Sequence, residues 1–331
     1  MSDLKIVIPD GHTLNPGDLD YSLLAEFGDL EIFPRSTPEE LLVRAKDADI
    51  LIGNKIILGE TQFRQLPRLK YVGLQSTGYN VVDVAAAARH GVTVTNVPAY
   101  STDAVVQNTF AHLLNITYHL GEHTAGVRAG RWTRCPDFCY WDFPPVELAG
   151  KTLGLIGFGN IAKGVARVAL MFRMKVIASR HTPTESGFSV LDGFPGGGTV
   201  PIPCVSREEI FGESDVVSLH CPMNAETAGI VSRENLARMR RGAILINTAR
   251  GGLVDERALA DALNESRLAG AGLDVLSTEP PAADNPLLTA KNCFITPHLA
   301  WGTLEARRRC LHVVVENVRA FLAGKPRNVV S

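Results

Sequence analysis

Residues 151–162, which read KTLGLIGFGNIA, decide the fold of this chain. The run Lys151–Ile156 is short, apolar and typical of a buried β-strand, and the residues after it carry apolar side chains at helical spacing. Between strand and helix lies the pattern Gly-x-Gly-x-x-Ala, which in this context predicts a loop that holds a dinucleotide pyrophosphate. Gly157 permits the tight turn and Gly159 lets the backbone approach the phosphates. We therefore expect a nucleotide-binding α/β domain around this loop.

Strand and helix patterns alternate on both sides of this segment. The box Thr37-Pro38-Glu39-Glu40 predicts one helix start, and Ser206-Arg207-Glu208-Glu209 predicts another. Such alternation predicts an α/β fold of two domains, each a parallel sheet with helices on both faces. The strands that we expect besides 151–156 are Lys5–Pro9, Ile50–Ile52, Tyr71–Leu74, Val92–Thr95, Lys175–Ala178, Val216–Leu219, Ala243–Ile246 and Ala271–Val275.

Composition excludes several classes of protein. The 331 residues suggest two domains, and the net charge of −2 gives no long-range field for nucleic acid or an anionic membrane. No apolar run approaches the roughly 18 residues of a membrane helix. Six cysteines in a chain of this length form no disulfide framework, so we expect reduced thiols in a cytoplasmic protein. No metal site is expected, and His112, His119 and His123 are interpreted as packing residues on one helix face.

The end of the second strand of the dinucleotide unit indicates which cofactor binds. An NAD-binding unit normally has Asp or Glu there, about 20 residues after the glycine loop, to hold the ribose hydroxyls. Here Arg180 stands at that place, next to Ser179 and close to Thr182. A guanidinium suits a ribose 2′-phosphate, and the two hydroxyls offer further donors. We predict that NADP is preferred and that NAD remains possible.

Three charged residues follow later strand patterns, where ligands bind in open α/β sheets. They are Arg250, Glu279 and His298. Hydride transfer to a 2-oxo acid needs a cation for the carboxylate and a proton donor for the new alkoxide. Arginine suits the first task and histidine the second, and a carboxylate beside the imidazole would favour its protonated form. The three residue types together suit hydride transfer to a 2-oxo acid, although each one alone could be a loop arginine, a surface glutamate or a capping histidine.

The motifs around these residues resemble the D-isomer-specific 2-hydroxyacid dehydrogenases. The resemblance rests on NTARGGLVDE at 247–256, GLDV at 272–275 followed by Glu279-Pro280, and TPH at 296–298. It implies that Arg250 binds substrate, that His298 is the general acid/base and that Glu279 tunes it. It also implies a Rossmann cofactor domain, 101–297, inserted in a flavodoxin-like substrate domain, 1–100 and 298–331. The residues it places at the cofactor are Asp274 and Thr248 at the nicotinamide end, and Cys221 and Pro222 at the adenosine end.

Within the family, the N-terminal motifs are most similar to the glycerate dehydrogenases, also called hydroxypyruvate reductases. These motifs are STGYN at 76–80, VPAYST at 97–102 and DFCYWDF at 137–143. The likeness implies hydroxypyruvate or glyoxylate as substrate, and a homodimer across which the aromatic loop between Gly121 and Gly150 would reach. It implies substrate contacts for Ser76, Thr77 and Gly78, and cofactor contacts for Thr102 and for the glycine loop Gly157, Phe158, Gly159, Asn160 and Ile161.

Two alternatives stay open at this point. A 3-phosphoglycerate dehydrogenase would use the same catalytic residues, although the loop at 75–80 carries no basic residue for a phosphate. A dinucleotide-sensing corepressor would bind the cofactor and partner peptides with little turnover, on the same fold. Turnover of small 2-oxo acids separates the second alternative from an enzyme.

Overall fold

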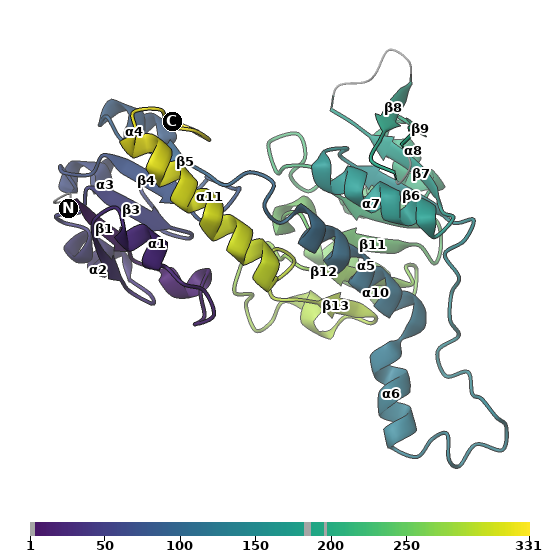
Figure 1. Cartoon of the computed structure of the whole chain (residues 1–331). Helices are drawn as coiled ribbons and strands as arrows, with labels where there is room; N and C mark the ends of the chain where they lie inside the picture. Colours follow the sequence, from purple (N-terminus) through teal and green to yellow (C-terminus); the bar gives the residue numbers. More distant parts are fainter. Residues whose placement is uncertain (1–3, 182–186, 195–196) are drawn as a thin grey trace. The chain divides into compact units, whose positions relative to one another are not determined.

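The computed structural model describes residues 4–181, 187–194 and 197–331, and the chain forms two compact units. Unit 1 consists of Met1–Ser101 and Trp301–Ser331, and unit 2 of Thr102–Ala300. The chain leaves unit 1 after Ser101 and returns at Trp301, so unit 1 is built from both ends of the sequence. Each unit contains its own parallel sheet (Figure 1).

Unit 1 contains a five-stranded parallel sheet in the order β2-β1-β3-β4-β5. Leu41, Phe63 and Ala86 from three helices pack on one face of this sheet. The Thr37 capping box is confirmed, with both reciprocal hydrogen bonds present. The strands are β1 (Lys5–Ile8), β2 (Asp29–Ile32), β3 (Ile50–Gly53), β4 (Tyr71–Leu74) and β5 (Thr93–Thr95), and the helices of the N-terminal part are η1 (Gly11–Thr13), α1 (Ser22–Ala25), α2 (Pro38–Arg44), α3 (Glu60–Gln65) and α4 (Val84–Arg89).

The C-terminal helix α11 (Leu304–Leu322) completes unit 1. The ring of Phe321 lies 4.7 Å from that of Tyr71 in β4, centroid to centroid. Arg307, which is 9% exposed, donates to both carboxylate oxygens of Asp18. An apolar contact to β4 and an ion pair to the loop before α1 therefore join the last helix to the N-terminal segment, and this explains how the two ends of the chain make one domain.

Unit 2 contains a six-stranded parallel sheet in the order β13-β12-β11-β10-β6-β7. One face is covered by helices that contribute Phe110, Leu113 and Val165, and the other by helices that contribute Phe211 and Leu259. The strands are β6 (Thr152–Ile156), β7 (Lys175–Ser179), β10 (Val216–Leu219), β11 (Ile244–Asn247), β12 (Gly270–Leu273) and β13 (Cys293–Ile295), and the helices are α5 (Thr102–Tyr118), α6 (Leu120–Arg128), α7 (Asn160–Met171), α8 (Arg207–Glu213), α9 (Arg233–Arg238), α10 (Glu256–Asn264), η2 (Gly251–Leu253) and η3 (Pro286–Thr289).

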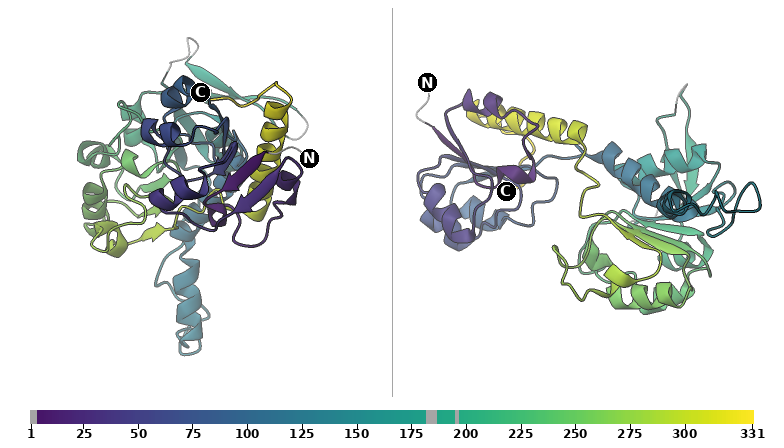
Figure 2. Two further views of the ribbon diagram at one scale, coloured as in Figure 1. Left: turned by 90° about the vertical axis from the view of Figure 1, so that its left-hand side faces the viewer. Right: turned by 90° about the horizontal axis from the view of Figure 1, so that it is seen from below.

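Two parts of unit 2 differ from the pattern-based expectation. The antiparallel hairpin β8 (Phe188–Leu191) and β9 (Val200–Pro203) was not predicted, and it lies beside β7 through the Ala178–Cys204 bridge. The expected aromatic loop begins with the helix α6, which extends away from the sheet of its own unit (Figure 2). Because His119 has a φ of +48°, α5 ends before it, and the three histidines do not share one continuous helix face.

Candidate functional site

The strand order of unit 2 brings the predicted catalytic residues to one edge of its sheet. Arg250 follows β11, Glu279 follows β12 and His298 follows β13, and these three strands are neighbours and parallel. The carboxyl ends of parallel strands meet at the same edge, so residues 48 positions apart in the sequence lie together. The glycine loop follows β6, between β7 and β10, where the direction of strand addition reverses. Ligands of open α/β sheets bind in the crevice at such a point.

The glycine loop has the shape that a pyrophosphate requires. Gly157 has a φ of +93°, and a Cβ atom there would lie 2.7 Å from the main-chain oxygen of His220. Gly159 is the N-cap of α7, offers no side-chain cap, and faces open space where a Cβ would stand. The first amide groups of α7 are thus left to bind an anion, with the positive end of the helix dipole behind them. A nicotinamide dinucleotide therefore fits this loop.

The other predicted residues of the loop lie where strand and helix meet. Phe158 and Ala162 are buried, and Asn160 and Ile161 begin α7. Ala162 is fully buried, which lets the helix pack closely on the sheet. The small residue at the third position of the motif therefore serves packing.

The residues predicted for the adenosine end of the cofactor lie at the ends of β7 and β10. Ser179 is buried, and the Arg180 guanidinium donates from Nη1 to Oγ of Ser189 in β8 at 3.0 Å. Thr182, the third predicted residue of this group, lies outside the described residues. Next to β10, burial raises the pKa of the Cys221 thiol, and the oxygen of Pro222 accepts a hydrogen bond from Thr227 Oγ1 at 2.7 Å.

Arg250 lies in a turn that the side chain of Asn247 holds. Asn247 is fully buried, donates to the main-chain oxygen of Arg250 at 2.9 Å and accepts from the amide of Ala249 at 3.0 Å. Thr248, within the turn, lies with its hydroxyl 3.3 Å from that of Thr109 in α5. The turn is therefore fixed from inside, and the exposed guanidinium of Arg250 donates from Nη1 to the main-chain oxygen of Ala249 in the same turn at 2.7 Å.

Glu279 and His298 form the shortest polar contact of the group. His298 Nδ1 lies 2.6 Å from Glu279 Oε2, and the other carboxylate oxygen accepts from the amide of Leu276 at 3.2 Å. A Cβ atom on Gly251 would lie 1.9 Å from the carbonyl carbon of Leu276, so glycine is required where the Arg250 turn meets the loop that carries Glu279. Because Nδ1 faces Glu279, Nε2 is the ring nitrogen that can face a substrate.

Asp274 holds the turn that carries His298. Its carboxylate accepts from Thr296 Oγ1 at 2.6 Å and from the amides of Leu299 and Ala300 at 2.8 and 2.9 Å, and its main-chain oxygen accepts from the amide of His298 at 2.8 Å. His298 itself has a φ of +54°, in the left-handed region. Such a conformation in a non-glycine residue persists only when its surroundings enforce it, and the Asp274 contacts do so.

The three predicted substrate residues of unit 1 form a tight loop after β4. Ser76 Oγ donates to the oxygen of Gly78 at 2.6 Å, and Thr77 Oγ1 donates to the oxygen of Val97 at 2.7 Å. Asn96 donates from its side chain to the oxygen of Thr77 at 2.8 Å. The hydroxyl groups therefore shape the loop in this structure, and their remaining capacity toward a ligand is as acceptors.

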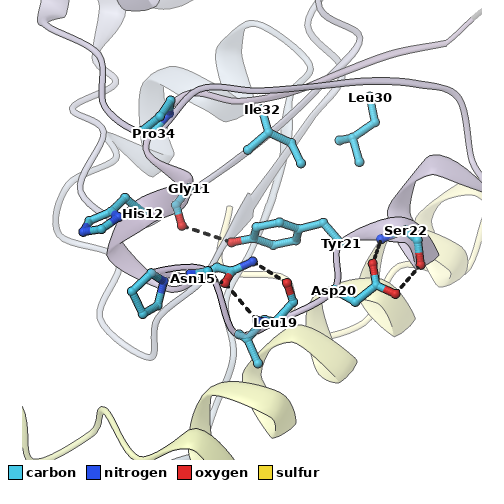
Figure 3. A pocket seen from close by; sticks show the side chains of 12 residues that line it. Gly11, His12, Asn15, Leu19, Asp20, Tyr21, Ser22, Leu30, Ile32 and Pro34 are labelled. Carbon is cyan, nitrogen blue, oxygen red and sulfur yellow. Dashed lines mark hydrogen bonds between the residues drawn. The ribbon is translucent and has the colours of Figure 1, made fainter.

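Unit 1 also has a cavity of about 510 Å³ between the loop after β1 and strand β2 (Figure 3). The Asn15 side chain donates to the oxygen of Leu19 and accepts from two amides of the same loop. Asp20 accepts from both the amide and the hydroxyl of Ser22. These polar groups therefore serve to shape the loop.

Some residues of the site were not found by pattern reasoning. Asn247 and Thr296 stand inside recognised motifs, but their side chains act on neighbouring turns, which spacing alone does not reveal. Within the described part of the chain, no helix is long and apolar enough to cross a membrane. No group of three potential metal ligands is found among those residues either.

This chain is similar to known proteins over nearly its whole length. The model of the D-isomer specific 2-hydroxyacid dehydrogenase NAD binding domain matches residues 110–300. A hydroxypyruvate reductase of Blautia hydrogenotrophica is 43% identical over 99% of this chain and 100% of its own length. A glycerate dehydrogenase of Methylorubrum extorquens is 38% identical over 98% of both chains.

A solved structure with the same fold is an acyclic imino acid reductase in complex with NADPH and D-Arg. It is 32% identical, with a TM-score of 0.83 over 99% of this chain and 100% of that protein. The predicted fold class and family are thus confirmed, and unit 2 binds a nicotinamide dinucleotide. The chain belongs to the family of D-isomer-specific 2-hydroxyacid dehydrogenases.

Proposed function

We propose that this protein reduces a small 2-oxo acid, hydroxypyruvate or glyoxylate, to the D-2-hydroxy acid. The observation that carries the proposal is the 2.6 Å contact between His298 Nδ1 and Glu279 Oε2, at the sheet edge that also holds Arg250. The proposal is also supported by two relatives: the chain is 43% identical to a protein named hydroxypyruvate reductase and 38% identical to one named glycerate dehydrogenase.

The proposed mechanism divides the work among these three residues. The Arg250 guanidinium binds the substrate carboxylate with two parallel hydrogen bonds and polarises the carbonyl group. A nicotinamide dinucleotide held by the glycine loop after β6 would supply the hydride for the carbonyl carbon. His298 donates a proton from Nε2 to the carbonyl oxygen, and Glu279 keeps the ring oriented and stabilises the imidazolium that precedes transfer. In the oxidation direction the same ring accepts the proton.

The other predicted site residues receive supporting roles in this proposal. Unit 1 is the substrate domain, in which the loop Ser76, Thr77 and Gly78 presents its main-chain amides to the substrate carboxylate. Unit 2 is the cofactor domain. We assign Thr248 and Asp274 to the nicotinamide end, and Cys221, Pro222 and Thr102 to further cofactor contacts.

A kinetic matrix tests the proposed reaction. Initial rates are measured with NADH and NADPH against hydroxypyruvate, glyoxylate, pyruvate and phosphohydroxypyruvate. We expect the largest kcat/KM for hydroxypyruvate or glyoxylate. A preference for phosphohydroxypyruvate would favour the phosphoglycerate dehydrogenase alternative, and absence of turnover with all four acids would favour a binding protein.

The proposal includes a preference for NADPH. Arg180 replaces the acidic residue that holds ribose hydroxyls in NAD-binding units, and Ser189 fixes one end of its guanidinium through Nη1. Among the described residues no acceptor is found for the other guanidinium nitrogens, and we assign them to a 2′-phosphate. The NADPH named in the imino acid reductase structure is consistent with this choice within the fold.

Replacing Arg180 with glutamine is expected to raise the KM for NADPH about 30-fold and to change that for NADH less than about 3-fold. The physical reason is the loss of a charge-assisted hydrogen bond, about 2 kcal/mol, that only the 2′-phosphate can accept. Steady-state kinetics with both cofactors provide the measurement, and Arg241→Gln, another exposed arginine of unit 2, is the control. Equal wild-type kcat/KM for the two cofactors would contradict the preference.

We also propose a homodimer formed through the arm that α6 begins. Phe138 is 88% exposed and Trp141 is 69% exposed, while Trp132 Nε1 and the Arg131–Asp142 pair hold the same loop in shape. Large exposed aromatic rings on an ordered loop are typical of a protein interface. Light scattering should report about twice the chain mass of 35.8 kDa, and Phe138→Glu with Trp141→Glu should reduce it to the monomer mass. A monomeric wild type would refute this.

The cytoplasm is the proposed location. All six cysteines are free thiols, as expected in a reducing compartment. Fractionation of cells that produce the tagged protein would test this assignment.

A further inference from the structure

His112 is a polar residue in the apolar contact between α5 and the sheet of unit 2. Its side chain is 6% exposed and faces β12. A Cβ atom on Gly272 in that strand would lie 2.5 Å from the Cβ of His112, so only glycine leaves room for the ring at this place. A buried imidazole destabilises a fold unless it is hydrogen-bonded, and its polar contacts therefore indicate its role.

Hydrogen bonds connect His112 to Asp274 through Thr296. His112 Nε2 lies 3.1 Å from Thr296 Oγ1, and Thr296 Oγ1 lies 2.6 Å from Asp274 Oδ1. A hydroxyl group has one hydrogen, and an ionised carboxylate can only accept, so Thr296 donates to Asp274. The Thr296 oxygen must then accept from His112, which places the hydrogen of the neutral ring on Nε2. Burial lowers the pKa of His112 and thus favours this neutral form at neutral pH.

The chain of hydrogen bonds ends on the turn that carries His298. The Asp274 carboxylate, oriented by Thr296, also accepts from the amides of Leu299 and Ala300. These two residues directly follow His298, whose left-handed backbone depends on its surroundings. An Asp274 side chain that rotated would release both amides at once, and His298 would lose its fixed position beside Glu279.

We propose that His112 is a positioning residue for the reaction. It donates to Thr296, fixes the direction of the Thr296 hydroxyl and, through Asp274, holds the turn that presents His298. His112 does not touch the substrate. The inference rests on the proposed function for the meaning of His298, and on the hydrogen bonds alone for the coupling of the four residues.

A double-mutant cycle tests the coupling. His112→Leu, which preserves volume, is expected to lower kcat about 10-fold with hydroxypyruvate, because an unrestrained Thr296 hydroxyl holds Asp274 less well. His112→Gln should recover activity to within about 3-fold of wild type, since its amide can donate from nearly the same place. Thr296→Val should lower kcat at least as much as His112→Leu does. In the Thr296→Val background, His112→Leu should cause no further loss of kcat.

Ile116→Val is the matched control, because Ile116 lies one turn further along α5 and packs on β12 at Gly270. We expect it to lower the melting temperature and to leave kcat unchanged. Losses that multiply in the double variant, or a His112→Leu enzyme with wild-type kcat, would overturn the inference. So would a failure of His112→Gln to restore activity in a folded protein.

A readout without turnover separates this inference from the proposed function. In protein labelled at histidine, the Cε1–H resonance of His298 reports its surroundings whether or not hydroxypyruvate is reduced. We expect His112→Leu and Thr296→Val to move this resonance in the same direction, and Ile116→Val to leave it in place. An unmoved resonance overturns the positioning role, whereas an inactive wild type with a moved resonance overturns only the proposed reaction.

Discussion

Replacing His298 with alanine is expected to lower kcat for the reduction of hydroxypyruvate about 1,000-fold. The imidazole is the proposed proton donor to the forming alkoxide, and general acid catalysis of this kind contributes about 100- to 10,000-fold. The side chain does not hold the glycine loop, which follows β6, so the KM for the cofactor should change little. Initial rates of cofactor oxidation at saturating substrate provide the measurement.

His312→Ala is the control for this experiment, because His312 is exposed on α11 and should be dispensable. The kcat of Glu279→Gln should lie between those of His298→Ala and His312→Ala. The amide can still bond to His298 Nδ1, but it carries no charge to stabilise the imidazolium. If the His298 variant kept more than about a tenth of the wild-type kcat, another group would have to supply the proton.

Replacing Arg250 with alanine is expected to lower kcat/KM for the 2-oxo acid about 1,000-fold, equivalent to about 4 kcal/mol. Two charge-assisted hydrogen bonds to the substrate carboxylate would be lost, together with the cation that polarises the carbonyl. Arg250→Lys keeps the charge but not the planar fork, so it should restore only part of the loss. The KM for the acid and kcat are measured separately for both variants.

Arg238→Lys is the matched control, since Arg238 is an exposed arginine of the same unit that pairs with Glu234. It should leave both kinetic constants unchanged. The binding role of Arg250 would be refuted if the alanine variant bound the 2-oxo acid with the wild-type KM. Recovery of the full wild-type kcat/KM in the lysine variant would show that the positive charge alone suffices, without bidentate hydrogen bonding.

Much of the fold could be predicted from local patterns. The glycine loop at 157–162 lies between β6 and α7, and the strands that read as buried apolar runs are strands of the two parallel sheets. The strands that were missed are half exposed. Glu31 and Ile32 in β2 are not fully buried, and in β8 Phe188 and Val190 are exposed while Ser189 and Leu191 are buried. Short strands of alternating burial resemble loops when only apolar runs are sought.

The candidate site was partly predictable, because parallel strands deliver the residues that follow them to one edge. That rule brought Arg250, Glu279 and His298 together, and the structure adds the 2.6 Å contact that pairs two of them. Their catalytic roles stay predictions. The spacing of the histidines predicts a packing role for His112 and does not reveal its contact with Thr296, 184 positions away in the sequence. No spacing rule connects a helix residue to a turn at that distance.

The kind of sheet, the place of the dinucleotide loop and the residue types at the sheet edge that holds Arg250, Glu279 and His298 follow from the sequence alone. These properties depend on short-range patterns, namely apolar periodicity, glycines at a tight turn and helix caps. Three properties depend on the folded chain: which ring nitrogen of His298 faces Glu279, why Gly251 and Gly272 must lack side chains, and how His112 reaches Asp274. Such properties arise where segments distant in the sequence approach within a few ångströms. Close packing at these contacts restricts which side chains fit and how they are oriented.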